Sequence, residues 1–195
     1  MKTCYFQGTF NPPHNGHLLI AEFVLKNTEY KEVVFVPAYK PPHKSLKETN
    51  PFHRLNMTKL LTENKEGLSV SDIEFQREEP SYTYETVKNI AKDERPAIII
   101  GDDAFDKIET WYKTEELKKI VDFILLPREN GCSEEKLKNL EEKGYNYRRL
   151  NMPFVDISST QIRNLIEKNL PTDGLIPEKI RRYADENNLY KHADR

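Results

Sequence analysis

The chain has 195 residues, of which 30 are Lys or Arg and 32 are Asp or Glu, so its formal charge is −2. This near balance provides no global field that would attract nucleic acid or an anionic membrane, and neither class of partner is expected. With 37% hydrophobic and 10% aromatic residues, the chain is too apolar to be a disordered polymer. Its length favours a single domain over residues 1–195.

The sequence indicates a soluble cytoplasmic protein. Its apolar runs are much shorter than the ~20 residues of a membrane span. The N-terminal stretch MKTCYFQGTF lacks the apolar core of a signal peptide. Cys4 lies in an apolar run and Cys132 in a loop that contains a glycine, so both are expected to be reduced thiols.

Short runs rich in β-branched and aromatic residues alternate with helical patterns. The runs predict strands at 3–6, 33–36, 68–70, 97–100, 123–126 and, less clearly, 147–150. Helices are predicted between them, opening at Gly16, near Pro51, near Thr83, after an N-cap at Thr114 and after an N-cap at Ser133. The alternation predicts an α/β fold, a Rossmann-like doubly wound parallel sheet with helices on both faces. Ligands of such sheets bind beyond the carboxyl ends of the strands.

The last quarter of the chain is predicted to be a helical C-terminal segment. Ser158 and Gln161 have the spacing of a capping box at the start of one helix. Pro177 is expected at the first position of the final helix. No stretch rich in Gly, Pro or Ser separates this segment from the rest of the chain, which supports one domain.

The stretch GTFNPPHNGHL, residues 8–18, follows the first predicted strand and leads into the first predicted helix. Gly8 permits close approach of the backbone at the strand end, and Gly16 lies at the helix start. A helix N-terminus offers N–H groups and the positive end of its dipole to an anion. His14 and His17 add two imidazoles, each able to donate a hydrogen bond to a phosphate oxygen. The stretch therefore predicts a phosphate-binding turn.

Two other interpretations of this turn are open. The histidines could be ordinary turn and helix-capping residues. They could also ligate a metal together with His43 or His53, but the spacing fits no zinc signature and no metal site is predicted. The chain contains neither G-x-G-x-x-G nor the P-loop lysine motif, so hydride transfer and P-loop chemistry are not predicted.

The turn resembles the His-x-Gly-His signature of the nucleotidyltransferase superfamily. Further stretches make the whole chain similar to the bacterial nicotinate-mononucleotide adenylyltransferases: PPHK at 41–44, FHR at 52–54, SYTYET at 81–86, IGDD at 100–103, WY at 111–112 and ISSTQIR at 157–163. The sequence departs from the family pattern at three places. Gln7 replaces a glycine, Asn11 replaces an aspartate, and the loop at 128–131 lacks the usual Arg-Pro-Gly.

The resemblance implies transfer of the adenylyl group of ATP to nicotinate mononucleotide, giving nicotinate adenine dinucleotide and pyrophosphate in NAD biosynthesis. The acceptor phosphate would attack the α-phosphorus in line, without a covalent intermediate. Mg²⁺ is expected as the cofactor, held through the phosphates of ATP and water rather than by a carboxylate cage. Both partners would be small-molecule substrates, and the resemblance leaves a homodimer open.

The resemblance also assigns the ATP-side residues. His17 would contact the α-phosphate and His14 the region between the α- and β-phosphates. Arg163, with the N–H groups of Ser159 and Thr160, would hold the β- and γ-phosphates, although these residues could also form an ordinary helix start. The resemblance implies further ATP contacts, among them Asp103 on a ribose hydroxyl. The residues that would make these contacts are Gly8, Thr9, Phe10, Gly16, Gly101, Asp103 and Ser158.

On the acceptor side, the implied residues are Lys44, Thr83, Tyr84 and Trp111. Lys44 suits a phosphate, and Trp111 would stack on the pyridine ring. The N–H groups at Thr83 and Tyr84 would receive the nicotinate carboxylate and disfavour an amide. A solvated lysine and a core aromatic residue are the alternative interpretations of Lys44 and Trp111.

Three other functions compete with this one. A transferase acting on phosphopantetheine, a polyol phosphate or an amine phosphate is opposed by the SYT and PPHK stretches and by Trp111. A relative of class I tRNA synthetases would need a longer chain, a lysine-rich signature loop and a basic surface. A nucleotide-sensing module without catalysis would need damaged phosphate contacts, whereas His14, His17 and Arg163 are all present.

Overall fold

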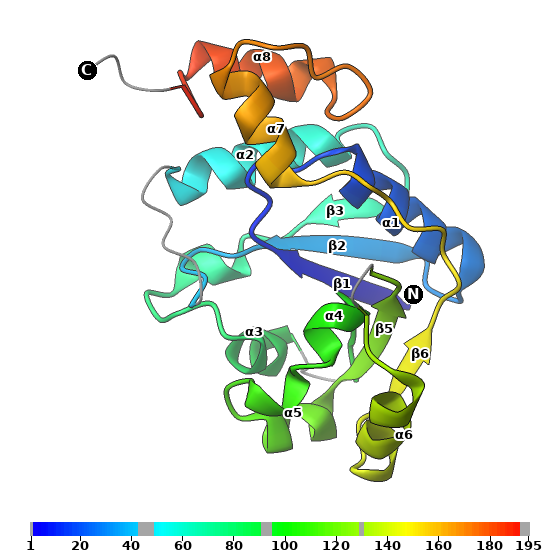
Figure 1. The fold of residues 1–195 in the computed structure, drawn as a ribbon. Helices are drawn as coiled ribbons and strands as arrows, with labels where there is room; N and C mark the ends of the chain where they lie inside the picture. The colour runs from blue at the N-terminus through cyan, green and yellow to red at the C-terminus, as the bar shows by residue number, and fades with distance from the viewer. Residues whose placement is uncertain (1, 43–48, 91–94, 129–130, 192–195) are drawn as a thin grey trace.

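The computed structural model of the protein describes residues 2–42, 49–90, 95–128 and 131–191. Within these residues, six parallel strands form one sheet in the order β3–β2–β1–β4–β5–β6 (Figure 1). The strands are β1 (Thr3–Gly8), β2 (Glu32–Pro37), β3 (Leu68–Val70), β4 (Ala97–Gly101), β5 (Asp122–Leu126) and β6 (Tyr147–Arg149). The predicted doubly wound parallel sheet is confirmed, and each predicted strand lies within about two residues of an observed one.

The order of the strands reverses next to β1. β1 pairs with β2 on one side, where Phe6 is opposite Phe35, and with β4 on the other, where Phe6 is opposite Ile99. The chain therefore crosses to opposite faces of the sheet after β1 and after β4. Such a reversal leaves a crevice at the carboxyl ends of the two central strands, which is where doubly wound sheets bind ligands.

Helices cover both faces of the sheet, as predicted. In Figure 1, α1, α2, α7 and α8 lie above the sheet, and α3, α5 and α6 lie below it. The helices are α1 (Asn15–Asn27), α2 (Pro51–Thr62), α3 (Thr83–Ile90), α4 (Asp102–Phe105), α5 (Thr114–Ile120), α6 (Glu134–Glu142), α7 (Ser159–Glu167) and α8 (Glu178–Glu186), with 3₁₀ turns η1 (Ile73–Gln76) and η2 (Ile108–Thr110). The short elements η1, α4 and η2 carry no clear periodicity and were not predicted. None of the helices in the described residues has the length and apolar character needed to cross a bilayer.

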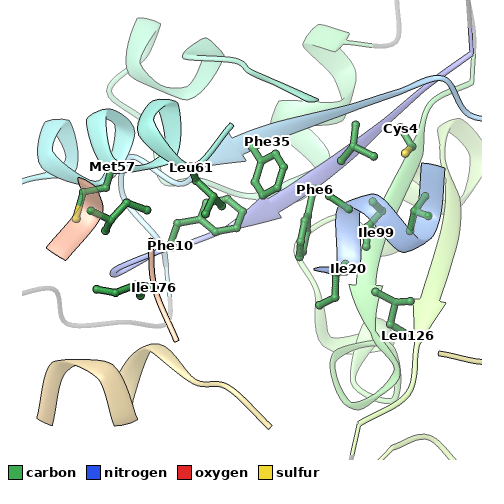
Figure 2. Close-up of a cluster of buried hydrophobic side chains, with 14 of the residues drawn as sticks. Cys4, Phe6, Phe10, Ile20, Phe35, Met57, Leu61, Ile99, Leu126 and Ile176 are labelled. Atoms are coloured by element: carbon green, nitrogen blue, oxygen red, sulfur yellow. The ribbon is translucent and has the colours of Figure 1, made fainter. Parts of the chain in front are cut away.

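Two clusters of buried side chains lie on the two faces of the sheet. Successive strand residues point to opposite faces, so Phe6 and Ile99 join the cluster under α1, α2, α7 and α8, whereas Ile98 joins the cluster over α3, α5 and α6. Figure 2 shows the first cluster, in which Phe6 and Phe10 pack edge to face and the Phe35 ring lies tilted against both. Because Phe10 belongs both to this core and to the turn after β1, the core fixes the position of the turn.

Two predicted helix starts are wrong by one residue. Thr114 is the first residue of α5 rather than its N-cap, because Lys113 holds that position in a left-handed conformation, with φ of 50°. The Thr114 hydroxyl instead shares a hydrogen bond of 2.8 Å with the Tyr145 hydroxyl. Pro177 is the N-cap of α8 rather than its first residue, since its ψ of 142° is extended. The predicted N-caps at Ser133 and Ser158 are confirmed, and each side chain accepts a backbone N–H bond.

Candidate active site

A cavity of about 960 Å³ opens at the carboxyl ends of β1 and β4, in the crevice that the strand order predicts. Gly8 at the end of β1 and Gly101 at the end of β4 form its floor, and residues of α7 and of the loop before α5 form its walls. The fold brings to this cavity the following predicted site residues: Gly8, Thr9, Phe10, His14, Gly16, His17, Thr83, Gly101, Asp103, Trp111, Ser158, Ser159, Thr160 and Arg163. Residues far apart in the sequence therefore meet in one site.

The two histidines of the turn lie against each other at the start of α1. The ring centroids of His14 and His17 are 3.7 Å apart, and the Nδ1 atom of His17 accepts a hydrogen bond of 3.2 Å from the backbone N–H of His14. An accepting Nδ1 requires that the neutral His17 ring carry its proton on Nε2. The edge of the Phe10 ring, 4.9 Å from the His17 ring, fixes its orientation further. The turn thus presents an N–H donor of defined position.

Two glycines make room for these rings. A Cβ atom at Gly16 would lie 2.9 Å from Nδ1 of His14, and a Cβ atom at Gly8 would lie 2.8 Å from Cζ of Phe10. Both contacts are closer than the packing of real Cβ atoms allows. The glycines of the GTFNPPHNGH stretch are therefore required by the packing of the aromatic rings, in addition to any close approach of a ligand.

His14 is held in its neutral form. It is 6% exposed, and burial, followed by the positive charge of Arg128, lowers its pKa from 6.5 to about 4. Its Nδ1 atom has no hydrogen-bond partner within the described residues. That atom faces Gly16, since a Cβ atom there would lie 2.9 Å from it, and a buried polar atom without a partner costs free energy. The His14 ring is therefore a neutral, tightly packed part of the cavity wall.

The C-terminal segment closes over the turn. The Arg163 Nη1 atom donates to the carbonyl oxygen of Asn11 at 2.8 Å, and the Ser159 hydroxyl donates to the carbonyl oxygen of Pro12 at 2.8 Å. The Tyr190 hydroxyl donates to Oδ1 of Asn11 at 2.6 Å. The start of α7 is consequently both a capped helix start and a wall of the cavity, so the two interpretations of the SST stretch are compatible.

The acceptor-side predictions have mixed outcomes. Thr83 and Trp111 line the cavity, but Lys44 lies outside the described residues. Tyr84 does not line it: its ring packs against the Tyr112 ring at 6.4 Å, and Nζ of Lys113 lies 4.9 Å from its centroid. The start of α3 at Thr83 nevertheless faces the cavity, so the proposed role of its N–H groups does not depend on the Tyr84 side chain.

A buried carboxylate ties α3 to the chain after β2. Glu74 is 2% exposed and accepts hydrogen bonds from the Thr86 hydroxyl at 2.7 Å and from the backbone N–H of Tyr39 at 3.2 Å. Arg77 Nη2 lies 3.8 Å from the same carboxylate and also donates to the Thr86 hydroxyl. This network fixes α3 relative to the floor of the cavity. No sequence pattern indicated this network, because an acidic residue in a short polar segment is normally exposed.

Comparison with known proteins identifies the family. The model of the family described as Cytidylyltransferase-like matches residues 5–165. A probable nicotinate-nucleotide adenylyltransferase of Caldicellulosiruptor bescii is 37% identical to this chain, over 98% of the chain and 100% of the relative. The chain belongs to the nicotinate-nucleotide adenylyltransferases, within the cytidylyltransferase-like family. The nicotinate-nucleotide adenylyltransferase of Bacillus subtilis is also 37% identical, over 97% of this chain and 98% of its own length.

Solved structures share the fold. Nicotinic acid mononucleotide adenylyltransferase of Plasmodium falciparum, complexed with NaAD, has a TM-score of 0.79 and 23% identity, with 97% of this chain and 98% of that chain covered. The same protein complexed with APC has a TM-score of 0.76. These likenesses confirm the Rossmann-like architecture, and the full-length relatives confirm the resemblance on which the site residues were predicted.

The alternative metal interpretation finds no support at His53. Its Nδ1 atom shares a hydrogen bond of 2.9 Å with the Tyr183 hydroxyl, so in this nucleotidyltransferase the residue joins α2 to α8 rather than entering the turn. His43, the other ligand considered, lies outside the described residues.

Several residues that line or support this adenylyltransferase site were not predicted, Glu74 among them. Arg54 is fully buried, and its guanidinium donates to the carbonyl oxygens of Thr9 at 2.9 Å, Ala38 at 2.5 Å and Tyr39 at 3.2 Å. It thereby clamps the ends of β1 and β2 together. Arg54 lies four residues before Thr58 on the buried face of α2, and this helical spacing was the sequence signal that Arg54 is buried. Arg128 and Gln7 also line the cavity, and the Nε2 atom of Gln7 has no partner within the described residues.

Proposed function

We propose that this chain transfers the adenylyl group of ATP to nicotinate mononucleotide, forming nicotinate adenine dinucleotide and pyrophosphate as a step of NAD biosynthesis. The observation that carries the proposal is the closely packed pair His14 and His17, which lies at a helix N-terminus in a cavity at the reversal point of the sheet. The full-length relatives named for this reaction support the choice of substrates.

The reaction is an in-line displacement at phosphorus. An oxygen of the acceptor 5′-phosphate attacks the α-phosphorus of ATP, and the bond from that phosphorus to the bridging oxygen breaks. Pyrophosphate leaves with the bonding electron pair, so no covalent intermediate forms. The acceptor phosphate is already ionised at neutral pH, so it needs no general base. Catalysis then depends on positioning and on stabilising the negative charge of the phosphate oxygens.

The histidine turn supplies that stabilisation. The Nε2–H of His17 donates to an α-phosphate oxygen, because its Nδ1 atom is occupied by the His14 backbone. His14 contacts the region between the α- and β-phosphates. The backbone from Gly8 to Phe10 and the helix start at Gly16 form the cradle.

The opposite wall holds the leaving group. Arg163 and the N–H groups of Ser159 and Thr160 contact the β- and γ-phosphates, with Ser158 capping the same helix. Gly101 and Asp103 at the end of β4 contact the adenosine, with Asp103 on a ribose hydroxyl. Within the described residues no three His, Cys, Asp or Glu side chains cluster, so Mg²⁺ is proposed to enter with ATP, held by its phosphates and water.

The acceptor occupies the side of the cavity formed by α3 and the loop before α5. Thr83 and Tyr84 offer backbone N–H groups at the start of α3 to the nicotinate carboxylate, and Trp111 stacks on the pyridine ring. Lys44 is proposed to contact the acceptor phosphate. A carboxamide at the same place would direct its own N–H groups at these donors, which disfavours nicotinamide mononucleotide.

The organisation of the protein completes the proposal. The two free cysteines, Cys4 and Cys132, are buried, as suits a cytoplasmic protein with reduced thiols. We expect residues 1–195 to act as one domain, which a single cooperative unfolding transition would support. A homodimer remains a prediction, and light scattering during size-exclusion chromatography tests it.

The test is pyrophosphate release from Mg·ATP with three acceptors: nicotinate mononucleotide, nicotinamide mononucleotide and phosphopantetheine. Strong preference for the acid supports the proposal. Preference for phosphopantetheine would preserve the histidine chemistry and overturn the acceptor assignment. If all three are inert while the folded protein still binds ATP, the chain is a nucleotide-sensing module instead.

A further inference from the structure

The carboxylate of Asp102 is buried and both of its oxygens are occupied. Asp102 is fully buried at the first position of α4, directly after β4. Its Oδ1 atom accepts a hydrogen bond of 2.8 Å from the backbone N–H of Arg128. Its Oδ2 atom lies 3.4 Å from Nη2 of Arg149, the last residue of β6. One carboxylate thus connects the ends of three neighbouring strands.

This carboxylate does not touch the cavity and does not cap its own helix. Asp102 is absent from the cavity wall that its neighbours Gly101 and Asp103 form. The N-cap of α4 is Gly101, and no side chain bonds the first turn there. A buried anion is costly unless paired and hydrogen-bonded. Here the partners are a backbone N–H and a guanidinium of the adjacent chain segments. The role of Asp102 is therefore to hold those segments in place.

Arg128 and Gly131 both lie directly against Asp102. Besides the hydrogen bond at Arg128, a Cβ atom at Gly131 would collide with the carboxylate of Asp102. The chain therefore passes over the carboxylate at both of these residues. A side chain at position 131 would displace either the backbone at that position or the carboxylate of Asp102. The glycine is therefore required for this packing.

The side chain of Arg128 extends from this anchored backbone to the cavity. Its Cγ and Nε atoms lie 3.0 and 3.1 Å from the place where a Cβ atom of Gly101 would be, so its side chain crosses the glycine at the end of β4. It lines the same cavity as His14, and its positive charge is felt there, since it contributes to the low pKa of that imidazole. The guanidinium therefore lies on the side of the cavity where ATP is proposed to bind.

We propose that Asp102 is a positioning residue for ATP: it holds the backbone of Arg128 so that the guanidinium extends across Gly101 and binds the nucleotide. The inference rests on the ATP site proposed above. Arg128 is the group that touches ATP, and Asp102 acts only through it. Arg149, shared between Asp102 and Glu134, balances the buried negative charge from outside the cavity.

The test is a double-mutant cycle on ATP binding, measured by calorimetry with Mg²⁺ and α,β-methylene-ATP. Asp102→Ala and Arg128→Ala should each weaken binding about tenfold, the effect of losing one hydrogen bond to a charged group. The double variant should be no weaker than Arg128→Ala alone, because Asp102 has nothing left to position. Asp102→Asn, whose amide oxygen can still accept from the Arg128 N–H, should recover most of the affinity and serves if the alanine variant does not fold.

Controls separate positioning from general damage. Arg148→Ala removes an exposed neighbouring arginine that pairs with Glu29, and it should leave ATP affinity unchanged. In turnover, Asp102→Ala should raise KM for ATP and leave KM for nicotinate mononucleotide within about twofold, as expected for a group acting on one substrate. Additive losses in the cycle, or wild-type affinity in Asp102→Ala, would overturn the proposal. Because calorimetry needs no acceptor, these results are distinct from a failure of the proposed reaction.

Discussion

The hydroxyl of Tyr190 donates a 2.6 Å hydrogen bond to Oδ1 of Asn11, joining residues 179 positions apart in the sequence. Asn11 is also held through its carbonyl oxygen by Arg163. The histidine turn, residues 8–18, therefore has its shape set from two sides: by the Phe10 ring in the core and by the C-terminal segment above it. The C-terminal helices are part of the active-site architecture as well as a cover for the sheet.

Replacing Tyr190 by Phe should affect both stability and activity. The variant loses one hydrogen bond, so we expect unfolding to become easier by about 1 kcal/mol. With Asn11 less constrained, kcat/KM for ATP should fall about fivefold, which corresponds to a similar free energy. Urea denaturation and steady-state kinetics measure the two effects. The matched control is Tyr183→Phe, which removes a hydroxyl bonded to His53 and Asn56 away from the turn and should lower stability alone. Equal kinetic losses in both variants would contradict this role of Tyr190.

His17→Ala should abolish most turnover without unfolding the protein. It removes the N–H donor proposed to bind the α-phosphate, and loss of one such donor typically costs ~10²–10³ in rate. His17→Gln, which can place an amide N–H near the former Nε2 position, should recover part of kcat. Circular dichroism melts check that both variants fold. A wild-type kcat in His17→Ala would refute the proposed mechanism.

His14 should make the protein less stable as the pH falls below neutral. Its pKa is about 4 in the folded protein, against 6.5 ordinarily, so between these values the unfolded chain binds a proton that the folded chain does not. The contribution of His14 to the free energy of unfolding is therefore fully present above pH 6.5, and it is lost progressively as the pH falls towards 4. The full effect is on the order of 3 kcal/mol.

The measurement is urea denaturation at pH 7.5, 6 and 5, on the wild type and on His14→Gln. Since the substituted side chain does not titrate, the variant should lose less stability over this range than the wild type. Carboxylates contribute equally to both proteins and cancel in the difference. Parallel losses of stability would show that His14 is not kept neutral by the fold.

Gln7→Leu should stabilise the free protein and weaken acceptor binding. The Nε2 atom of Gln7 is buried without a partner in the described residues, which costs ~1–3 kcal/mol. Gln7 is two residues after Tyr5 on β1, so both point to the face that also packs Trp111, the proposed acceptor side. Removing the amide should raise the unfolding free energy by about 1 kcal/mol and raise KM for nicotinate mononucleotide about fivefold, with KM for ATP nearly unchanged.

Gln76→Leu is the control for this substitution. Gln76 is exposed and donates to Asp72, so its replacement should give no gain in stability and no change in either KM. If Gln7→Leu destabilises the protein and leaves both KM values unchanged, the amide serves packing and not the acceptor.

Local patterns sufficed for the framework of the protein. Runs such as Ile98 to Ile100 are apolar at every position because a parallel strand is covered on both faces, and they predicted β4 correctly. The caps at Ser133 and Ser158 depend only on a side chain and the N–H three residues later. The two-histidine turn could also be recognised from a local pattern, because the end of β1, the two histidines and the start of α1 are nearly consecutive in the sequence.

Only the tertiary structure decided what surrounds that turn. The sequence marks Arg54, Glu74 and Asp102 as charged, and charged residues are normally on the surface. Each is nevertheless buried and has a hydrogen-bond partner at least twelve positions away. Burial with compensating hydrogen bonds is a property of the assembled chain, which no local window contains. The sequence by itself predicted the parallel sheet and located the two-histidine turn. The packing of distant segments determined the order of the strands and which buried charges hold the site in shape.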